Sequence, residues 1–208
     1  MILTIFGATG GTGRELVDQA CSAGHDVTAV VRSPDGVAPR PHLTVVTADI
    51  AVADQLVPAV AGRDAVLTAI GPRGRGPTTV QADTTTSIIA AMRAAGVRRL
   101  VCVSNSGMHT DGDGPLTRAL VKPILRGALR HGFADMRRME ELVAASGLDW
   151  TILRPPRLTN GRRTGTYRTE VNRNVRGGMQ VSRADLADCV LRCLTDPSAI
   201  RAAVSVSN

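Results

Sequence analysis

The chain has 208 residues, of which 43% are hydrophobic and 21% charged, and its formal net charge is +7. This length and composition predict one folded domain over residues 1–208 and exclude a disordered or fibrous chain. No apolar run approaches the roughly 20 residues of a membrane helix, and no basic region precedes the apolar run 2–6, so we expect a cytoplasmic protein without a membrane partner.

Short β-branched runs alternate along the chain with segments of helical spacing. Strands are predicted over 2–6, 27–31, 43–47, 65–70, 100–103, 151–153 and 203–206, and helices over 14–23, 78–95, about 134–145, and 182 to about 194. The last helix is expected to begin with a capping box at Ser182-Arg183-Ala184-Asp185, with Asp in the usual Glu position. Nearly uninterrupted apolar strands indicate a sheet covered on both faces, and intervening helices favour parallel pairing. The pattern predicts an α/β fold with a doubly wound parallel sheet.

The sequence GATGGTG occupies residues 7–13, between the first predicted strand and the first predicted helix. Glycine permits a tight turn and lets the backbone approach a pyrophosphate, which the helix N-terminus then attracts. The strand–glycine–helix context indicates a Rossmann-like dinucleotide site. No lysine lies in or beside this loop, so a Walker A nucleotide site is excluded.

The end of the second predicted strand bears on the choice of cofactor. An NAD site usually places a carboxylate there, whereas NADP requires a cation for its 2′-phosphate. This chain has Arg32 and Ser33, and no acidic residue at either position. Both side chains can donate to a phosphate, so the sequence predicts NADPH as the cofactor.

Several common sites are excluded or disfavoured. The chain has one tyrosine, Tyr167, and one lysine, Lys122, in the wrong order and 45 positions apart for a Tyr-x-x-x-Lys proton relay. No G-x-S-x-G occurs, which argues against a serine hydrolase. The four cysteines have no metal-binding or disulfide spacing and are interpreted as small buried hydrophobes. They are Cys21, Cys102, Cys189 and Cys193.

Positive charge is concentrated in residues 118–138 and 154–176. Arg118, Lys122, Arg126 and Arg130 recur every four residues and would form a basic stripe on a helix. Prolines and glycines in that segment weaken the helix, and aromatic residues, which nucleic-acid surfaces use for stacking, make up only 2% of the chain. We therefore do not expect nucleic acid as a partner. The oligomeric state is left open.

The glycine loop is accompanied by further motifs in a characteristic order. They are Val31-Arg32-Ser33, Gly71-Pro72-Arg73, Pro77-Thr78-Thr79-Val80, Ser146-Gly147-Leu148-Asp149-Trp150-Thr151, Arg154-Pro155-Pro156 and Thr164-Gly165-Thr166-Tyr167. With these motifs the chain resembles an atypical short-chain dehydrogenase/reductase, and more narrowly the NAD(P)H-binding group that contains flavin reductase, also called biliverdin IXβ reductase. The likeness spans nearly the whole chain.

The resemblance implies roles for matching positions. The pyrophosphate would be held by Gly7, Thr9, Gly10, Gly11, Thr12 and Gly13, and the 2′-phosphate by Arg32 with Ser33. The adenine would lie between Asp49 and Ile50, and the cofactor channel would be lined by Gly71 and Arg73. The nicotinamide would face Ser104, Asn105 and Ser106, with Pro155, Pro156 and Arg157 as the other wall.

Two positions depart from the flavin-reductase pattern. Asn105 stands where those enzymes carry a serine beside the nicotinamide, and Arg157 stands where they carry a histidine after the double proline. Neither is an obvious proton donor at neutral pH. The catalytic candidates are therefore Ser104, Asn105, Ser106 and Arg157.

The leading hypothesis is hydride transfer from NADPH to a flat conjugated acceptor such as a flavin, whose reduced form can take a proton from water. Residues 155–181 would cover the acceptor, and Arg157, Arg162 and Arg163 would attract an anionic group on it. Within 155–181 we expect loop, with one short hairpin around Tyr167.

Two alternatives are kept. The first is a tailoring enzyme of small natural products, of the ketoreductase or epimerase type, in which Ser104, Ser106 or His109 would supply acid–base chemistry. Against that role, His109 lies in a polar loop and is expected to be a plain surface residue. The second is a non-catalytic NADP(H) sensor, which the lack of a proton-relay pair would permit.

Overall fold

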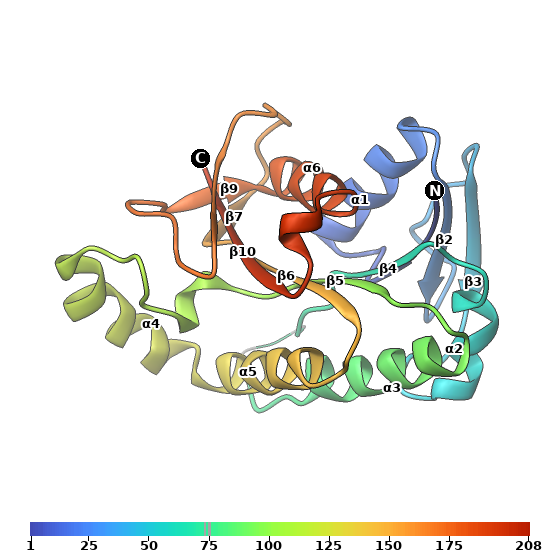
Figure 1. The fold of residues 1–208 in the computed structure, drawn as a ribbon, viewed down its shortest axis with the longest axis horizontal. Coiled ribbons are helices and arrows are strands. Elements are labelled where there is room, and N and C mark those ends of the chain that lie inside the picture. Colours follow the sequence, from blue (N-terminus) through green and yellow to red (C-terminus); the bar gives the residue numbers. More distant parts are fainter. Residues whose placement is uncertain (73, 75) are drawn as a thin grey trace.

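The computed structural model describes residues 1–72, 74 and 76–208, without the side chains of residues 121, 125, 126 and 128. An eight-stranded sheet of order β3-β2-β1-β4-β5-β6-β10-β8 runs through the molecule (Figure 1). Every pairing in it is parallel except that of β8 with β10. The predicted Rossmann-like doubly wound fold is therefore confirmed, with one antiparallel edge.

The strands of this sheet are β1 (Ile2–Phe6), β2 (Asp26–Val31), β3 (Leu43–Thr47), β4 (Ala65–Thr68), β5 (Arg99–Val103), β6 (Asp149–Arg154), β8 (Arg168–Val171) and β10 (Ala202–Ser207). A separate pair of parallel strands joins β7 (Arg157–Thr159) to β9 (Gln180–Ser182). Most of residues 155–181 is loop, as predicted, but the expected hairpin around Tyr167 is wrong, because the short strands β7, β8 and β9 of this segment do not pair across Tyr167. Their partners are distant in sequence.

Helices cover both faces of the sheet (Figure 1). One face carries α1 (Gly11–Ser22) and α6 (Arg183–Cys193), and the other carries α2 (Ala53–Val60), α3 (Val80–Ala94) and α5 (Arg130–Ala144). Successive β1 residues divide between the two faces: Ile5 packs toward α1 and α6, and Phe6 toward α2 and α3. Two apolar cores therefore bury the strands, as their uninterrupted hydrophobicity predicted.

The segment between β5 and α5 forms an arm at one end of the molecule. It contains the short turns η1 (Ser106–Met108) and η2 (Thr117–Val121) and the helix α4 (Lys122–Ala128). Pro123 does not interrupt this arm: η2 runs directly into α4, and Lys122 at their junction has helical φ and ψ and donates its backbone N–H to the Thr117 carbonyl oxygen. The break falls at Leu129, whose φ of −115° and ψ of 20° are not helical.

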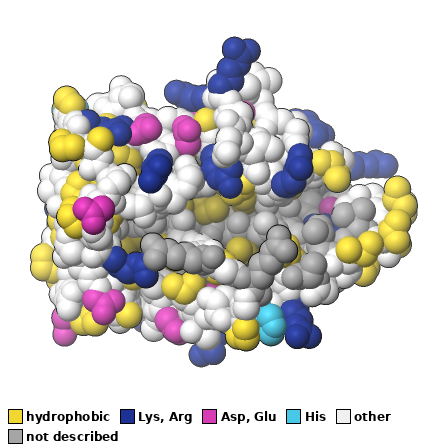
Figure 2. Space-filling view, turned by 180° about the vertical axis from the view of Figure 1, so that it is seen from behind, with side chains coloured by type: hydrophobic (Ala, Val, Ile, Leu, Met, Phe, Trp, Pro, Cys, Tyr) yellow, Lys and Arg dark blue, Asp and Glu magenta, His cyan; other side chains and the backbone are white. Residues whose placement is uncertain are grey.

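The surface of the arm is apolar rather than uniformly basic. Figure 2 shows hydrophobic side chains at this end of the molecule as well as at the opposite end, with Lys and Arg spread over the face between them. The most exposed large hydrophobic residues of the arm are Leu116, Ile124 and Leu120. Lys122 is buried, so the solvent-exposed stripe proposed from the spacing of Arg118, Lys122, Arg126 and Arg130 does not form.

Two further predictions concern helix ends and cysteines. Ser182 caps α6 as expected, since its Oγ accepts a hydrogen bond of 2.9 Å from the Asp185 backbone N–H. All four cysteines are unpaired and buried, in agreement with their interpretation as small hydrophobes. A last short turn, η3 (Pro197–Ala199), leads into β10. Among the described residues, no helix is long and apolar enough to cross a bilayer.

Candidate active site at the carboxyl edge of the sheet

The glycine loop forms a tight backbone cradle between β1 and α1. Gly7 has a φ of +80°, which favours glycine. Its carbonyl oxygen accepts a hydrogen bond of 3.0 Å from Gly10 N–H. A Cβ at Gly13 would overlap that same carbonyl oxygen, and a Cβ at Gly7 would lie 2.8 Å from the Ala69 carbonyl group. The loop therefore has this form only with glycine at both positions.

The cradle leaves the N-terminus of α1 open to an anion. The N-cap residue, Gly10, has no side chain to cap the helix, and the first turn contains no acidic residue. The Arg183 side chain lies against Gly11, because a Cβ at Gly11 would be 2.7 Å from Arg183 Cδ and Nε. Arg183 Nη1 also donates to Asn160 Oδ1 at 2.5 Å. A cation beside an uncapped helix N-terminus favours an anionic ligand such as a pyrophosphate.

Sequence reasoning did not find Arg183. It is the first residue of α6, about 170 positions after the loop, and α6 packs against α1. No local pattern connects the two segments. The juxtaposition exists only because both helices cover the same face of the sheet.

The end of β2 places Arg32 at the surface, directly after the last strand residue, Val31. Ser33 is already engaged, because its Oγ donates to Asp35 Oδ2 at 2.6 Å. A 2′-phosphate at this point would meet the Arg32 guanidinium, whereas the Ser33 hydroxyl would first have to leave Asp35. The structure thus separates the two residues that the sequence grouped together.

The ends of β3 and β4 contribute little side-chain chemistry. Asp49 begins a turn in which its Oδ1 accepts from Ala51 N–H at 3.0 Å, and its own N–H donates to Gln55 Oε1. Ile50 packs partly against the core below α2 and α3. Gly71 is exposed after β4, and Arg73 lies outside the described residues.

The three residues after β5 have different environments. The Ser104 hydroxyl is buried and donates to Glu140 Oε1 at 2.6 Å. Asn105 Oδ1 accepts from Gly107 N–H at 2.6 Å and so caps η1. Asn105 and Ser106 both line a cavity at this edge of the sheet, whereas Ser104 is absent from the described lining of that cavity. Ser104 is therefore placed to fix the end of β5 rather than to meet a substrate.

Glu140, on α5, organises a buried cluster behind this strand end. Its carboxylate accepts from Arg154 Nη2 at 2.6 Å and from Ser104, and His109 Nε2 lies 3.1 Å from Oε2. Burial alone would raise the pKa of Glu140, but the hydrogen bonds from His109, Arg154 and Ser104 outweigh it and lower the pKa to about 2. His109 thus packs beside Glu140 with 26% of its side chain exposed, so its expected role as a plain surface residue is wrong.

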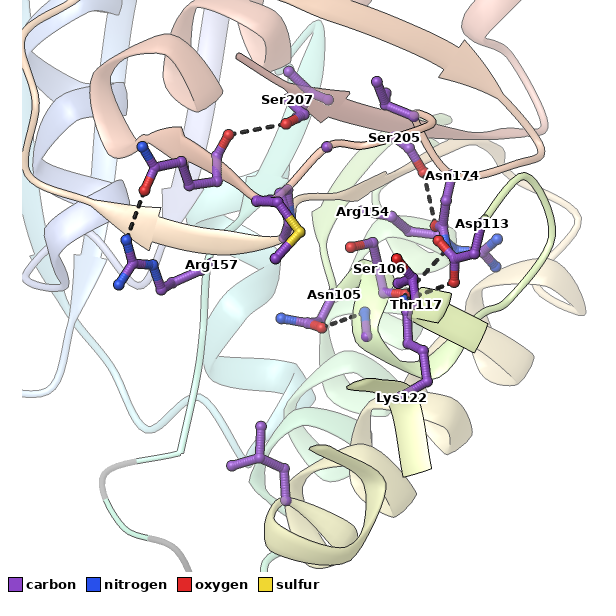
Figure 3. Close-up of a pocket in the computed structure, with 18 of the residues that line it drawn as sticks. Asn105, Ser106, Asp113, Thr117, Lys122, Arg154, Arg157, Asn174, Ser205 and Ser207 are labelled. Atoms are coloured by element: carbon purple, nitrogen blue, oxygen red, sulfur yellow. Dashed lines mark hydrogen bonds and ion pairs between the residues drawn. The ribbon is translucent and has the colours of Figure 1, made fainter. Parts of the chain in front are cut away.

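A cavity of about 500 Å³ lies beyond the carboxyl ends of β5 and β6 (Figure 3). Its apolar wall includes Leu129, Phe133, Pro156, Met179 and Val206. Its polar wall includes Asn105, Ser106, Asp113, Lys122, Arg154 and Asn174. The cavity combines a hydrophobic surface with a few converging polar groups, which is the usual composition of a small-molecule site.

Lys122 lies at the polar end of the cavity. Its Nζ donates to the Ser106 carbonyl oxygen at 2.5 Å and lies 3.4 Å from Asp113 Oδ2. Asn174 Nδ2 donates to Asp113 Oδ1 at 3.1 Å and to the His109 carbonyl oxygen at 2.9 Å. Figure 3 shows Lys122 extending toward Ser106, Asp113 and Thr117.

Of the three arginines expected to attract an acceptor, only Arg157 is among the described cavity-lining residues. Its Nη2 donates to Gln180 Oε1 at 2.6 Å. Arg163 instead pairs with Asp188 on α6, and Arg162 is exposed. Tyr167 also points to α6, because its hydroxyl donates to Asp188 Oδ2 at 2.6 Å. Burial and this hydrogen bond raise the pKa of Tyr167.

Comparison with known proteins gives concordant matches. The model of the NAD(P)H-binding family matches residues 7–197. YwnB of Bacillus subtilis is 28% identical over 205 residues, which cover 95% of this chain and 93% of YwnB. A short-chain dehydrogenase/reductase of Veillonella parvula in complex with NADP has a TM-score of 0.84 at 20% identity, covering 100% of this chain and 94% of that one. ChuY, an anaerobillin reductase of Escherichia coli O157:H7, has a TM-score of 0.75 at 22% identity, covering 100% and 97%.

Proposed function

This chain belongs to the NAD(P)H-binding family, and on that premise we propose that it is an NADPH-dependent oxidoreductase acting on a flat, conjugated small molecule. One observation carries the proposal. The cavity of about 500 Å³ is bounded by Asn105 and Ser106, the residues expected beside the nicotinamide. This chain belongs to a family that binds a hydride carrier. It has a pocket of substrate size at the edge of the sheet where the reactive end of that carrier is expected.

The glycine cradle fits the pyrophosphate of the cofactor. No side chain caps the N-terminus of α1 at Gly10, and that terminus offers its first N–H groups and partial positive charge. Arg183 would add a full positive charge on the other side of the anion. Thr9 and Thr12 would complete this part of the site, as the family resemblance implies.

NADPH rather than NADH is favoured by the end of β2. Arg32 is exposed there, and a guanidinium can bind a 2′-phosphate through two parallel hydrogen bonds. The neighbouring Asp35 is held by Ser33, which keeps its carboxylate engaged. We assign the 2′-phosphate contact to Arg32 and give Ser33 at most a secondary part.

When bound, the reduced cofactor supplies the hydride. The residues of this chain orient the reacting groups and exclude water. Asn105, whose Oδ1 accepts from Gly107 N–H, would present its amide nitrogen to the cavity, and Pro156 would form a rigid part of the wall after β6. The Glu140 cluster holds Ser104 and Arg154 so that the ends of β5 and β6 stay in register.

The acceptor would lie between the apolar and polar walls of the cavity. Phe133, Met179 and Val206 suit the faces of a conjugated ring system, while Arg157 suits an anionic substituent. Residues 155–181 supply part of this lining through Pro156, Arg157 and Met179, which supports their proposed role as a substrate-covering segment. ChuY is an example of this fold in a reductase of a conjugated molecule.

The direct test is steady-state oxidation of NADPH in the presence of FMN or riboflavin. We expect turnover with at least one of these acceptors and a higher affinity for NADPH than for NADH. NADPH binding measured by calorimetry without oxidation of the cofactor by either acceptor would contradict the proposal and favour a sensor.

A matched pair of variants tests the cradle. Gly11→Asp places a carboxylate in the first turn of α1, where it stabilises the helix but repels a pyrophosphate. Gly11→Asn has nearly the same shape without the charge. We expect Gly11→Asp to abolish NADPH binding while thermal stability is kept, and Gly11→Asn to bind measurably. Equal binding by the two variants would contradict an anion site at this helix terminus.

A further inference from the structure

Lys122 is chemically singular in this chain. It is the one lysine among 25 Lys and Arg residues. A guanidinium stays protonated in proteins, whereas a lysine ammonium can give up its proton when its surroundings favour the neutral amine. Apart from the four histidines, Lys122 is thus the only basic side chain of the sequence that can serve as an acid, and the fold buries it in a cavity wall, with 5% of the residue exposed.

The surroundings of Lys122 hold its Nζ at a fixed place. The Ser106 carbonyl oxygen accepts from it at 2.5 Å, so it lies beside a residue assigned to the nicotinamide region. Asp113 Oδ2, 3.4 Å away, has no hydrogen-bond partner among the described residues, while Asp113 Oδ1 is fixed by Asn174. Burying such a pair is costly, which indicates a use beyond stability (Figure 3).

Other groups of the site are poorer acids. Ser106 and Thr117 carry hydroxyls, and Arg154 and Arg157 keep their protons at neutral pH. Ser104 and His109 are engaged with Glu140 and are absent from the described lining of the cavity. Asp113 is the counter-ion of Lys122 and accepts hydrogen bonds.

We propose that Lys122 is the proton donor to the acceptor and that the acceptor class is a flat conjugated carbonyl compound, such as a quinone or enone. This inference rests on the proposed function. Adding a hydride to an enone forms a carbon–hydrogen bond at the β-carbon and leaves an enolate, whereas adding a hydride to one carbonyl oxygen of a quinone forms an oxygen–hydrogen bond and leaves the hydroquinone monoanion. In both cases the displaced π-electron pair ends on a carbonyl oxygen. Lys122 Nζ gives its proton to that oxygen, and the resulting neutral amine takes a proton from water. The acceptor is reduced by two electrons and the nicotinamide cofactor is oxidised by two.

Asp113 and Asn174 act as positioning residues in this proposal. Asp113 keeps the resting ammonium charged and beside Ser106, and Asn174 keeps Asp113 in place. The carbonyl oxygen of the acceptor would enter the polar end of the cavity, and its rings would lie against Phe133 and Met179.

Two Lys/Arg exchanges, one helical turn apart on the same arm, test the assignment. Lys122→Arg keeps the charge but removes the transferable proton, and Arg118→Lys makes the reverse exchange at an exposed position. With 9,10-phenanthrenequinone as acceptor, we expect Lys122→Arg to lower kcat by about 100-fold or more, the size of a general-acid contribution. Arg118→Lys should keep the wild-type kcat. NADPH affinity by calorimetry checks that each variant is folded.

The outcomes separate this proposal from the proposed function. A wild-type protein that reduces neither FMN nor the quinone contradicts the proposed function itself. Quinone turnover that survives Lys122→Arg at the wild-type rate contradicts only the role of Lys122.

A second measurement needs no turnover. Protein labelled with ¹³C at the lysine Cε carries a single labelled residue, so its NMR signal reports Lys122 alone. We expect the signal to shift when 9,10-phenanthrenequinone is added together with oxidised NADP. A signal unchanged at a saturating quinone concentration would overturn the proposed contact, including when Lys122→Arg proves unstable.

Discussion

The cofactor cradle and the acceptor cavity are built in opposite ways. The cradle is one continuous stretch, residues 7–13, and it is formed mainly by backbone atoms. The cavity is assembled from side chains of segments that lie far apart, among them Lys122, Arg157, Asn174 and Val206. Family membership can therefore be recognised from one short motif, whereas the substrate can be approached only through the fold.

The difference extends to electrostatics. The cradle attracts an anion with the partial charges of a helix terminus, which truncation of a side chain does not remove, although an added negative charge such as that of Gly11→Asp opposes them. The cavity depends on individual buried charges, each held by a partner: Glu140 with Arg154, and Lys122 with Asp113. We expect removal of a single charged side chain to damage the cavity side more than the cradle side.

Glu140→Gln should show the largest effect. It leaves Arg154 buried without its counter-ion, which costs about 3–5 kcal/mol for a buried pair. We expect a marked fall in the free energy of unfolding, measured in urea, while the cofactor affinity of the folded protein stays close to that of the wild type. A stability equal to that of the wild type would contradict the importance of this cluster.

The same pair has a defined acid dependence. The pKa of Glu140 is lowered from 4.5 to about 2 in the folded protein, so its stabilising contribution is complete above about pH 4.5 and is lost as the pH falls toward 2. Wild-type stability should decline through this window more steeply than that of Glu140→Gln. Parallel curves for the two proteins would show that Glu140 is not responsible.

Arg32→Ala tests the cradle side. A charge-assisted hydrogen bond contributes about 1.5–3 kcal/mol, so NADPH affinity should fall about 10- to 100-fold. NADH affinity should not change. Arg173→Ala, which removes an exposed arginine paired with Glu170, serves as the control. An unchanged ratio of NADPH to NADH affinity would remove Arg32 from its role.

Ser182→Ala should have the smallest effect, at the junction of the two regions. Ser182 ends β9, beside the cavity, and caps α6, whose first residue is Arg183 of the cradle. Loss of an N-cap costs about 1 kcal/mol, so the thermal midpoint should fall modestly without a change in cofactor preference. Ser198→Ala, at an exposed turn, should cost less. Equal effects would contradict a capping role.

Local patterns predicted the parallel strands, the glycine loop and the Ser182 cap, because each depends on neighbours in sequence. They missed α2, a short helix that contains Pro58 near its end. They also missed the strands of residues 155–181, where β8 pairs with β10 and β7 pairs with β9. Each of these strands is distant in sequence from its partner. Pairing between distant strands leaves no periodic signal in either one.

For the candidate site, the sequence indicated Asn105, Ser106 and Arg157, all of which line the cavity, but it separated neither Ser104 from them nor Ser33 from Arg32. It considered Lys122 as part of a basic stripe that prolines and glycines in the segment argued against. A signal was present, since a single lysine in an arginine-rich chain suggests chemistry that arginine cannot supply. The four-residue spacing of the basic side chains drew attention to a surface stripe instead of to this signal.

The sequence by itself determined the fold class and the anion cradle, because hydrophobic periodicity and glycine geometry act over a few residues. Only the tertiary structure decided which charges are buried and which are paired. Arg183 lies against Gly11, and Lys122 contacts Ser106, although each pair is distant in sequence. These contacts form only because α6 and the arm pack onto the sheet. The environment of a side chain determines its chemistry, and that environment is set by residues that are close in space but distant in sequence.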